Sequence, residues 1–305
     1  MKKLLCLIIA SIVLIGGCDY MPFESSEDIP KSVNVKTYKG QYMGDHHNDN
    51  KVFLKKYKKD AERVFKEYAK DTFDTEMDVT QIYSYTNGSK YGSYPAIVTI
   101  GRAKGEYPFQ LYLRMRATED NKLTVFMPSI SESAYTGAPI ASMIYKRYQK
   151  EFDAAHKNFK QVVEKEGYYA MNETLTHKKD ASGIIDDYMT IRTTGVDDGE
   201  TFKKDFLPVM KLKGQAYNDA MDELMEKYPI IKSQLNTEFN IYYDKSKIKT
   251  EQAADYLLEL QKKTYKDMKR ISGEKTITAS QNKINPQNLE PISKEFNIDG
   301  GMIYD

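Results

Sequence analysis

The segment Phe109-Gln-Leu-Tyr-Leu-Arg-Met-Arg-Ala117 decides the fold of this chain. Its apolar residues stand at every second position and alternate with polar or amphipathic ones: Phe109, Leu111, Leu113 and Met115 against Gln110, Tyr112, Arg114 and Arg116. A period of two predicts a β-strand with one face toward a core and the other toward solvent. Sheets of this kind are usually antiparallel, because a purely parallel sheet is covered on both faces.

Three further segments around this strand also have the composition of strands: residues 78–85, 96–102 and 123–127. The first is followed by Asn87-Gly88, a dipeptide that is frequent in two-residue hairpin turns. The second is rich in β-branched residues, which favour strands. The order predicts a meander of four antiparallel strands between residues 78 and 127.

Two amphipathic helices flank this meander in the sequence. The first is predicted at residues 50–70 and the second at residues 139–166, starting at Pro139 and ending at Gly167. Their apolar stripes consist of Leu54, Tyr57, Ala61, Val64, Phe65 and Tyr68, and of Ile140, Ile144, Tyr148, Phe152, Ala155, Phe159 and Val162. We expect both helices to cover the sheet, because burial of such stripes is the main term that favours folding. The fold class is therefore α+β.

The second half predicts a smaller α+β lobe. Its strands are expected at residues 187–193, 238–243 and 276–280, and its helices at 202–228 and 250–268. Pro208 and Gly214 predict a break near the start of the first of these helices. The expected organisation is an α+β lobe at 32–167, a second α+β lobe at 168–285, and a loosely ordered C-terminal tail at 286–305.

The N-terminus has the layout of a secretory signal. A basic start at Lys2 and Lys3 precedes an apolar run from Leu4 to Ile15. That run is about a dozen residues, shorter than the roughly 20 that cross a bilayer as a helix. An uncleaved membrane anchor is the alternative, and it is disfavoured by the paired glycines that follow, because glycine weakens a helix.

The residues that end this leader, Ile15-Gly16-Gly17-Cys18, resemble the bacterial lipobox. The resemblance implies that Cys18 receives a diacylglycerol, that cleavage follows Gly17, and that residues 1–17 are a signal peptide. Residues 18–31 are polar and contain Pro22 and Pro30, so they are expected to form a flexible tether. The protein would then lie on the outer face of the cell membrane as a lipoprotein, held there by acyl chains such as palmitate.

The segment Ser32-Val-Asn-Val-Lys-Thr-Tyr-Lys-Gly-Gln41, which also predicts a first strand, is similar to the opening of a family of uncharacterised lipoproteins from Gram-positive bacteria. The similarity returns at Tyr242-Tyr-Asp-Lys-Ser-Lys247 and spans most of residues 32–285. The family is a domain of unknown function, so the resemblance implies attachment beneath the wall and supplies no active-site residues.

Composition excludes several classes of function. The chain has 45 Lys and Arg against 44 Asp and Glu, which argues against nucleic acid as a partner. The two cysteines, Cys6 and Cys18, both belong to the leader region, so the exported body has no thiol for a disulfide, a zinc site or a nucleophile. Tyrosine is frequent, with 24 residues and no tryptophan. Half-buried strand positions explain this better than a tyrosine-rich binding surface.

Few residues form a recognisable site. His46 and His47 lie beside Asp45 and Asp49, but adjacent residues point in different directions, and we expect an exposed loop without metal. His156 and His177 have no nucleophile or carboxylate at a recognisable sequence distance. The acidic pairs near predicted element ends are Asp186-Asp187 and Asp197-Asp198. No catalytic, cofactor or metal-binding residue is predicted.

The leading hypothesis is a membrane-anchored extracytoplasmic lipoprotein of unknown molecular function that binds a wall polymer, a peptide, a small ligand or another protein. The first alternative is a hydrolase of wall or exogenous material that uses two carboxylates, since such a pair is defined in three dimensions and not by spacing. The second is the solute-binding component of an importer, which normally needs two doubly wound lobes. The predicted antiparallel meander disfavours it.

Overall fold

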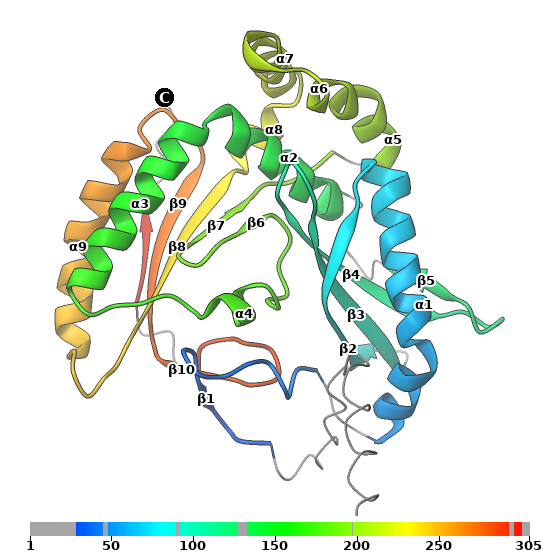
Figure 1. Cartoon of the computed structure of the whole chain (residues 1–305). Helices are drawn as coiled ribbons and strands as arrows, with labels where there is room; N and C mark the ends of the chain where they lie inside the picture. Colours follow the sequence, from blue (N-terminus) through cyan, green and yellow to red (C-terminus); the bar gives the residue numbers. More distant parts are fainter. Residues whose placement is uncertain are drawn as a thin grey trace, which may run out of the picture.

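The computed structural model describes residues 29–44, 48–89, 92–126, 133–196, 198–292 and 296–300. Two sheets stand at an angle to one another, and long helices cover the outer face of each (Figure 1). The predicted α+β class is confirmed. Within the described residues, no helix is both long enough and apolar enough to cross a membrane.

The first sheet has the predicted meander. It consists of β2 (Met77–Ser89), β3 (Gly92–Ala103), β4 (Gln110–Ala117) and β5 (Leu123–Val125), each antiparallel to the next. The predicted turn at Asn87-Gly88 is wrong, because these residues pair with Tyr94 and Ser93 inside the ladder. The Asn87 side chain donates a hydrogen bond to the Tyr94 hydroxyl at 2.7 Å, a contact that keeps the two strands paired.

Helix α1 (Asn48–Phe73) confirms the first predicted helix and packs on this sheet. Leu111, Leu113 and Met115 are fully buried on the face that the helices cover. The fully buried Phe65 of α1 approaches β3 at Gly101, where a Cβ atom would lie only 2.6 Å from the Phe65 ring. Glycine at this position therefore lets the helix lie close to the sheet.

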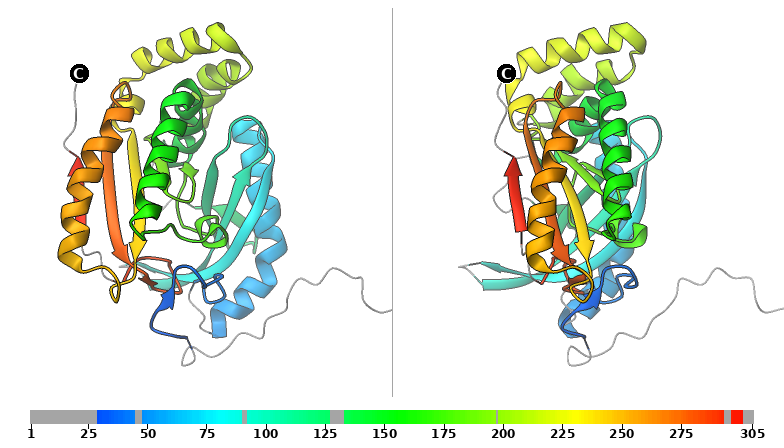
Figure 2. Two further views of the ribbon diagram at one scale, coloured as in Figure 1. Left: turned by 60° about the vertical axis from the view of Figure 1, so that its left-hand side comes forward. Right: turned by 90° about the vertical axis from the view of Figure 1, so that its left-hand side faces the viewer.

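The second predicted helix is two helices, α2 (Ser133–Arg147) and α3 (Gln149–Lys165). Pro139 lies inside α2 and does not begin it, and the break falls at Tyr148, whose backbone leaves the helical region. Of the two, α2 packs on the first sheet, through β4. Helix α3 instead packs beside α9 (Thr250–Asp267), so the expectation that it covers the first sheet is wrong (Figure 2). The Phe159 and Phe239 ring centroids, 4.5 Å apart, join α3 to the second sheet.

The second sheet has the order β11-β9-β8-β7-β6. Its strands are β6 (Ile184–Ile185), β7 (Met189–Arg192), β8 (Asn236–Tyr243), β9 (Glu274–Gln281) and β11 (Phe296–Gly300). Neighbours are antiparallel except β8 and β9, which are parallel and joined through α9. The strands predicted in this half are confirmed.

The predicted broken helix lies between β7 and β8. It consists of α5 (Gly199–Thr201), a π-helical turn (Phe202–Phe206), α6 (Leu207–Met210), α7 (Gly214–Lys227) and α8 (Pro229–Ser233). The predicted break at Gly214 is confirmed, because α7 begins there after a gap at residues 211–213, whereas the break at Pro208 is wrong, because Pro208 lies in the first turn of α6, which follows the π-helical turn directly.

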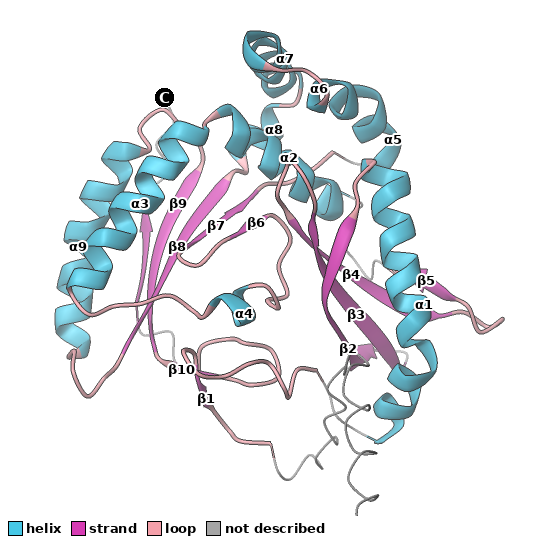
Figure 3. Ribbon diagram, in the orientation of Figure 1, coloured by secondary structure: helices cyan, strands magenta, loops and turns pink. Residues whose placement is uncertain are grey.

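Short elements occupy the space between the two sheets. They are β1 (Val33–Asn34), which pairs with β10 (Lys283–Ile284), and helix α4 (Glu173–Thr176), all shown in Figure 3. The strand predicted from Ser32 to Tyr38 is therefore only two residues long. The prediction of a loosely ordered tail is wrong for its described part, because Leu289 is fully buried and β11 pairs with β9.

One large cluster of buried residues runs from α1 through α2 and α3 to α9 and the second sheet. The two predicted lobes, 32–167 and 168–285, therefore share this core across residue 167. A smaller cluster, which includes Tyr83, Val98, Leu175 and Leu289, lies on the opposite, inner side of the first sheet.

Candidate functional site

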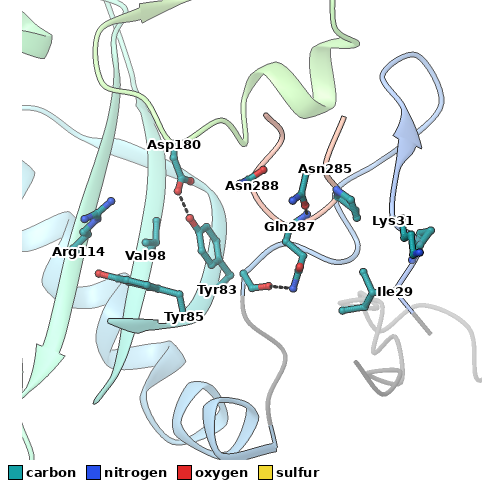
Figure 4. Close-up of a pocket in the computed structure, with 13 residues that line it drawn as sticks. Ile29, Lys31, Tyr83, Tyr85, Val98, Arg114, Asp180, Asn285, Gln287 and Asn288 are labelled. Carbon is teal, nitrogen blue, oxygen red and sulfur yellow. Dashed lines mark hydrogen bonds between the residues drawn. The ribbon is translucent and has the colours of Figure 1, made fainter. Parts of the chain in front are cut away.

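A cavity of about 770 Å³ opens beside the inner face of the first sheet. This volume lies within the roughly 300–1,000 Å³ of small-molecule sites. Figure 4 shows the residues that line it: Ile29, Pro30, Lys31, Gly44, Tyr83, Tyr85, Val98, Arg114, Asp180, Asn285, Pro286, Gln287 and Asn288. They come from the start of the described chain, three strands and two loops. We call this hollow the inner cavity.

The registers of the strands show which residues form the wall of the inner cavity. Tyr83 pairs with Val98, and Val98 pairs with Arg114, so the three residues form one row across β2, β3 and β4. Because side chains alternate along a strand, this row points away from the face that carries Leu113. The alternation in residues 109–117 thus places Arg114 on the side of the sheet that α1 and α2 leave uncovered.

Tyr83 and Asp180 form the central polar contact of the inner cavity. The Tyr83 hydroxyl donates a hydrogen bond to the Asp180 carboxylate, and the dashed line in Figure 4 marks this contact. Burial raises the pKa of Tyr83, and the neighbouring carboxylate raises it further. The Asp180 side chain is exposed to the cavity, yet the surrounding protein desolvates it and raises its pKa, against the opposing effects of Tyr83 and Arg114.

Arg114 and Tyr85 hold polar atoms without partners. The Nε of Arg114 and the hydroxyl of Tyr85 are buried, and neither has a hydrogen-bond partner among the described residues. The Arg114 Cζ lies 5.6 Å from the Tyr85 ring centroid and 5.7 Å from that of Tyr112, so its guanidinium has an aromatic neighbourhood. Burial raises the pKa of Tyr85 to about 12. Buried polar groups are normally paired, so two unpaired ones at one cavity call for an explanation.

The rim is held in place by contacts between distant parts of the chain. Gly44 N donates to the Gln287 carbonyl at 3.0 Å, and Gln287 Nε2 donates to the Gly44 carbonyl at 3.0 Å. Gly44 has a φ of 83°, and a Cβ atom there would lie 2.4 Å from the Tyr83 ring, so only glycine fits. The Tyr38 hydroxyl also donates to the Pro286 carbonyl at 2.9 Å. The inner cavity is therefore preformed.

A second polar group lies outside this cavity, between α3 and the turn from β6 to β7. His156 Nε2 lies 2.7 Å from one Asp187 carboxylate oxygen, and Lys160 Nζ lies 2.7 Å from the other. His156 therefore has a carboxylate neighbour that its sequence spacing did not reveal, because helix and turn meet only in the folded chain. The hydrogen bond to Asp187 raises the pKa of His156, against the lowering effect of burial.

Asp186 completes this group, because one of its carboxylate oxygens lies within 4.8 Å of a His156 ring nitrogen and of an Asp187 carboxylate oxygen, close enough to share a cation. One nitrogen and two carboxylate ligands are a plausible set for zinc. Lys160, however, already occupies one oxygen of Asp187. The group is therefore complete as a His–Asp–Lys ion-pair network, and we assign it a structural role.

The remaining sequence candidates do not meet in a site. His177 contacts the Arg102 guanidinium, and burial lowers its pKa. Asp198 caps α5 through a hydrogen bond from the Thr201 amide. Asp45, His46, His47 and Asp197 lie outside the described residues, as do Gly17 and Cys18 of the predicted lipobox. The side chain of Asp49 is likewise not described.

Sequence reasoning missed the polar residues of the inner cavity, among them Tyr83, Tyr85, Arg114 and Asp180. For Arg114 a signal existed, because its place on the polar side of an alternating strand was visible. Asp180 lies in an irregular segment, 97 residues from Tyr83 in sequence, and nothing local to it predicts their contact.

The sequence matches no protein-family model and no curated protein. Its structure is similar to the crystal structure of a DUF1672 family protein from Staphylococcus aureus subsp. aureus Mu50, with a TM-score of 0.70 and 16% identity, over 89% of this chain and 98% of that one. A DUF5037 family protein from Ruminococcus gnavus ATCC 29149 covers 72% of this chain and 73% of its own, at 12% identity and a TM-score of 0.26.

The two neighbours differ in weight. The first likeness shows that the α+β fold is shared over nearly the whole chain, and at this identity it shows the fold alone. The TM-score of the second neighbour is too low to show a shared fold. The first neighbour belongs to a family of unknown function from a Gram-positive bacterium, in agreement with the kind of family that the sequence resembles.

Proposed function

We propose that this chain is a lipid-anchored lipoprotein of the outer face of the cell membrane that binds a ligand in the inner cavity. The observation that carries the binding role is a preformed cavity of about 770 Å³ whose wall holds two buried, unpartnered polar atoms, on Arg114 and Tyr85. An unpaired buried polar group costs about 1–3 kcal/mol. A bound ligand that pairs with these residues offsets that cost.

The anchor rests on the sequence of the leader, which ends in Gly16-Gly17-Cys18. Two acyl chains, at about 0.8 kcal/mol per buried CH₂, hold a protein on a bilayer far more firmly than one. We expect Cys18→Ala to abolish labelling by a palmitate analogue and to leave the precursor uncleaved in cells. Cys6→Ala is the matched control and should be labelled and processed normally. Labelling of the Cys18 variant would refute the anchor.

The alternatives fit this geometry less well. A glycosidase needs two carboxylates flanking the bond that breaks, and among the described lining residues Asp180 is the one carboxylate. An importer's binding component normally has two doubly wound lobes. Here the described strands of the second sheet include a single parallel pair, β8 and β9.

The absence of tryptophan from the sequence allows a direct test of binding. In Asn288→Trp an exposed rim residue becomes the one indole of the chain, and its fluorescence should change when a ligand enters the inner cavity. Lys232→Trp places an exposed indole on α8, outside the lining residues, and should not respond.

The full chain in detergent is titrated with neutral sugars, acidic sugars and short peptides. A saturable change in Asn288→Trp alone supports the proposal. No change with any probe, or equal changes in both variants, would overturn the binding role.

A further inference from the structure

We propose that the ligand of the inner cavity is an acidic carbohydrate or polyol, a hydroxylated molecule that carries one oxyanion. This inference rests on the proposed binding function and names its ligand class. Arg114 is assigned to the oxyanion, and Asp180 and Tyr85 to hydroxyl groups. The inference follows from the charges, the free hydrogen-bonding capacity and the aromatic surface of the wall.

The charge of the wall favours an anion. Among the described lining residues, Arg114 and Lys31 are cationic and Asp180 is the single anionic residue. The effect of Asp180 on a ligand is reduced, because one of its carboxylate oxygens already accepts the hydrogen bond from Tyr83. A cationic or strongly apolar ligand would leave the Arg114 guanidinium desolvated without compensation.

Arg114 is suited to an oxyanion in particular. Its planar guanidinium offers parallel N–H donors that match the two oxygens of a carboxylate or a phosphate. The Tyr85 and Tyr112 rings lie within 6 Å of its Cζ and favour the cation, since the face of an aromatic ring attracts positive charge. The side chain thus lies in an environment that keeps it charged, and it lines the inner cavity.

The rest of the wall offers hydrogen-bond partners for hydroxyl groups of a ligand. A carboxylate has about four lone-pair sites, and the hydrogen bond from Tyr83 uses one of those on Asp180. The remaining sites can accept hydrogen bonds from ligand hydroxyls, and the Tyr85 hydroxyl can donate to or accept from another. The tyrosine rings and Val98 add apolar surface, which fits the C–H groups of a sugar or polyol.

The test compares four probes on the full chain in detergent, by isothermal titration calorimetry: glucose 1-phosphate, glucuronic acid, glucose and inorganic phosphate. Both acidic sugars should bind, and glucose should bind at least about tenfold more weakly, because a charge-assisted pair with arginine is worth about 1.5–3 kcal/mol or a factor of ten or more. Inorganic phosphate should also bind more weakly than glucose 1-phosphate. The ratio of the two acidic sugars decides between a phosphate and a carboxylate ligand.

Variants assign the interaction to residues. Arg114→Gln should reduce the affinity for acidic sugars by about tenfold or more and leave that for glucose unchanged, and Arg114→Lys should recover part of the loss. Arg116→Gln removes an exposed arginine from the same strand, outside the lining residues, and should change nothing. Asp180→Asn should weaken all the sugars but not inorganic phosphate. Circular dichroism confirms that each variant is folded.

The outcomes separate the two proposals. If glucose or a peptide binds at the inner cavity as tightly as the acidic sugars, or if Arg114→Gln has no effect, the acidic ligand is refuted and the binding role stands. If none of the probes binds and Asn288→Trp reports no ligand of any class, both proposals fall. Binding of inorganic phosphate as tight as that of glucose 1-phosphate would overturn the assignment of Asp180 and Tyr85 to hydroxyl groups.

Discussion

On the outer face of the first sheet, Leu111, Leu113 and Met115 are fully buried beneath α1 and α2, whereas on the inner face Tyr83 and Arg114 border a cavity. Leu111, Leu113 and Met115 alternate with Arg114 along β4, and Tyr83 lies in the same cross-strand row as Arg114. The outer face contributes stability mainly through apolar burial, although the Thr99 hydroxyl opposite Leu113 is also buried without a partner among the described residues. The inner face differs because its unpaired donor belongs to a charged side chain that lines a cavity, which favours binding. Leu113 and Arg114, one position apart, therefore have different roles: the first stabilises the fold and the second lines the cavity.

The largest effect should come from placing a charge in the packed side of the molecule. Phe152 of α3 is fully buried in the core that joins the two sheets. Phe152→Asp should destabilise the protein by several kcal/mol or prevent folding, because a buried carboxylate without a partner is strongly unfavourable. Chemical denaturation followed by circular dichroism measures the effect. An unchanged midpoint would remove α3 from the core, and Lys157→Asp on the exposed side of α3 is the control.

The second prediction compares the two faces of β4 directly. Leu113→Ala should lower the free energy of unfolding by about 2–5 kcal/mol, the usual range for a buried leucine. Arg114→Gln, one residue further along, should change it by less than about 1 kcal/mol, because the variant removes a buried donor that has no partner. Equal losses in the two variants would show that the inner face is also a packing face, and the comparison would fail.

The smallest effect concerns the His156–Asp187 pair and depends on pH. Asp187 raises the pKa of His156 above its ordinary 6.5, so this contribution is complete below about pH 6.5 and is lost as the pH rises through the raised value. Burial alone would raise the pKa of Asp187, but His156 and Lys160 outweigh it and hold that pKa well below 3.8. The contribution of Asp187 is therefore present above about pH 4 and is lost in strong acid.

His156→Gln tests this window. The difference in Tm between the natural protein and the variant should be largest near pH 5–6, where it corresponds to about 1 kcal/mol or less, and should shrink above about pH 8. Asp186 and Lys160 also face the histidine and act on its charge. A difference that is constant with pH would show that the imidazole contributes only by packing, and Lys157→Gln should give no pH-dependent difference.

Much of the fold followed from local pattern. The alternation around Leu113 and the helical stripe of α1 predicted a one-sided antiparallel sheet and its cover, because each pattern directly reports which side chains are buried. The stripe of α3 was equally visible, but an apolar stripe does not specify which sheet it packs on. Leu289 likewise appeared to belong to a loose tail, since the contacts that bury it come from segments distant in sequence.

The site was less accessible to sequence reasoning for a related reason. Arg114 and Asp180 come from a strand and from an irregular loop, and neither belongs to a motif of fixed spacing. Their proximity is created by hydrogen bonds from Gln110 of β4 to the Lys179 and Ala181 carbonyls, which hold the loop of Asp180 against the strand. The sequence therefore predicted the strands that border the inner cavity but not the polar residues that line it.

The position of Ile29, Pro30 and Lys31 at the inner cavity has a consequence for where binding takes place. If Cys18 carries the proposed diacylglycerol, the chain from Cys18 to Ile29 can reach at most about 40 Å, at 3.3–3.6 Å per residue. The rim would then never leave a thin layer above the bilayer. Within that layer the effective concentration of any membrane-linked ligand is high, so even a millimolar intrinsic affinity suffices for frequent occupancy. The same affinity for a freely diffusing molecule would leave the cavity mostly empty.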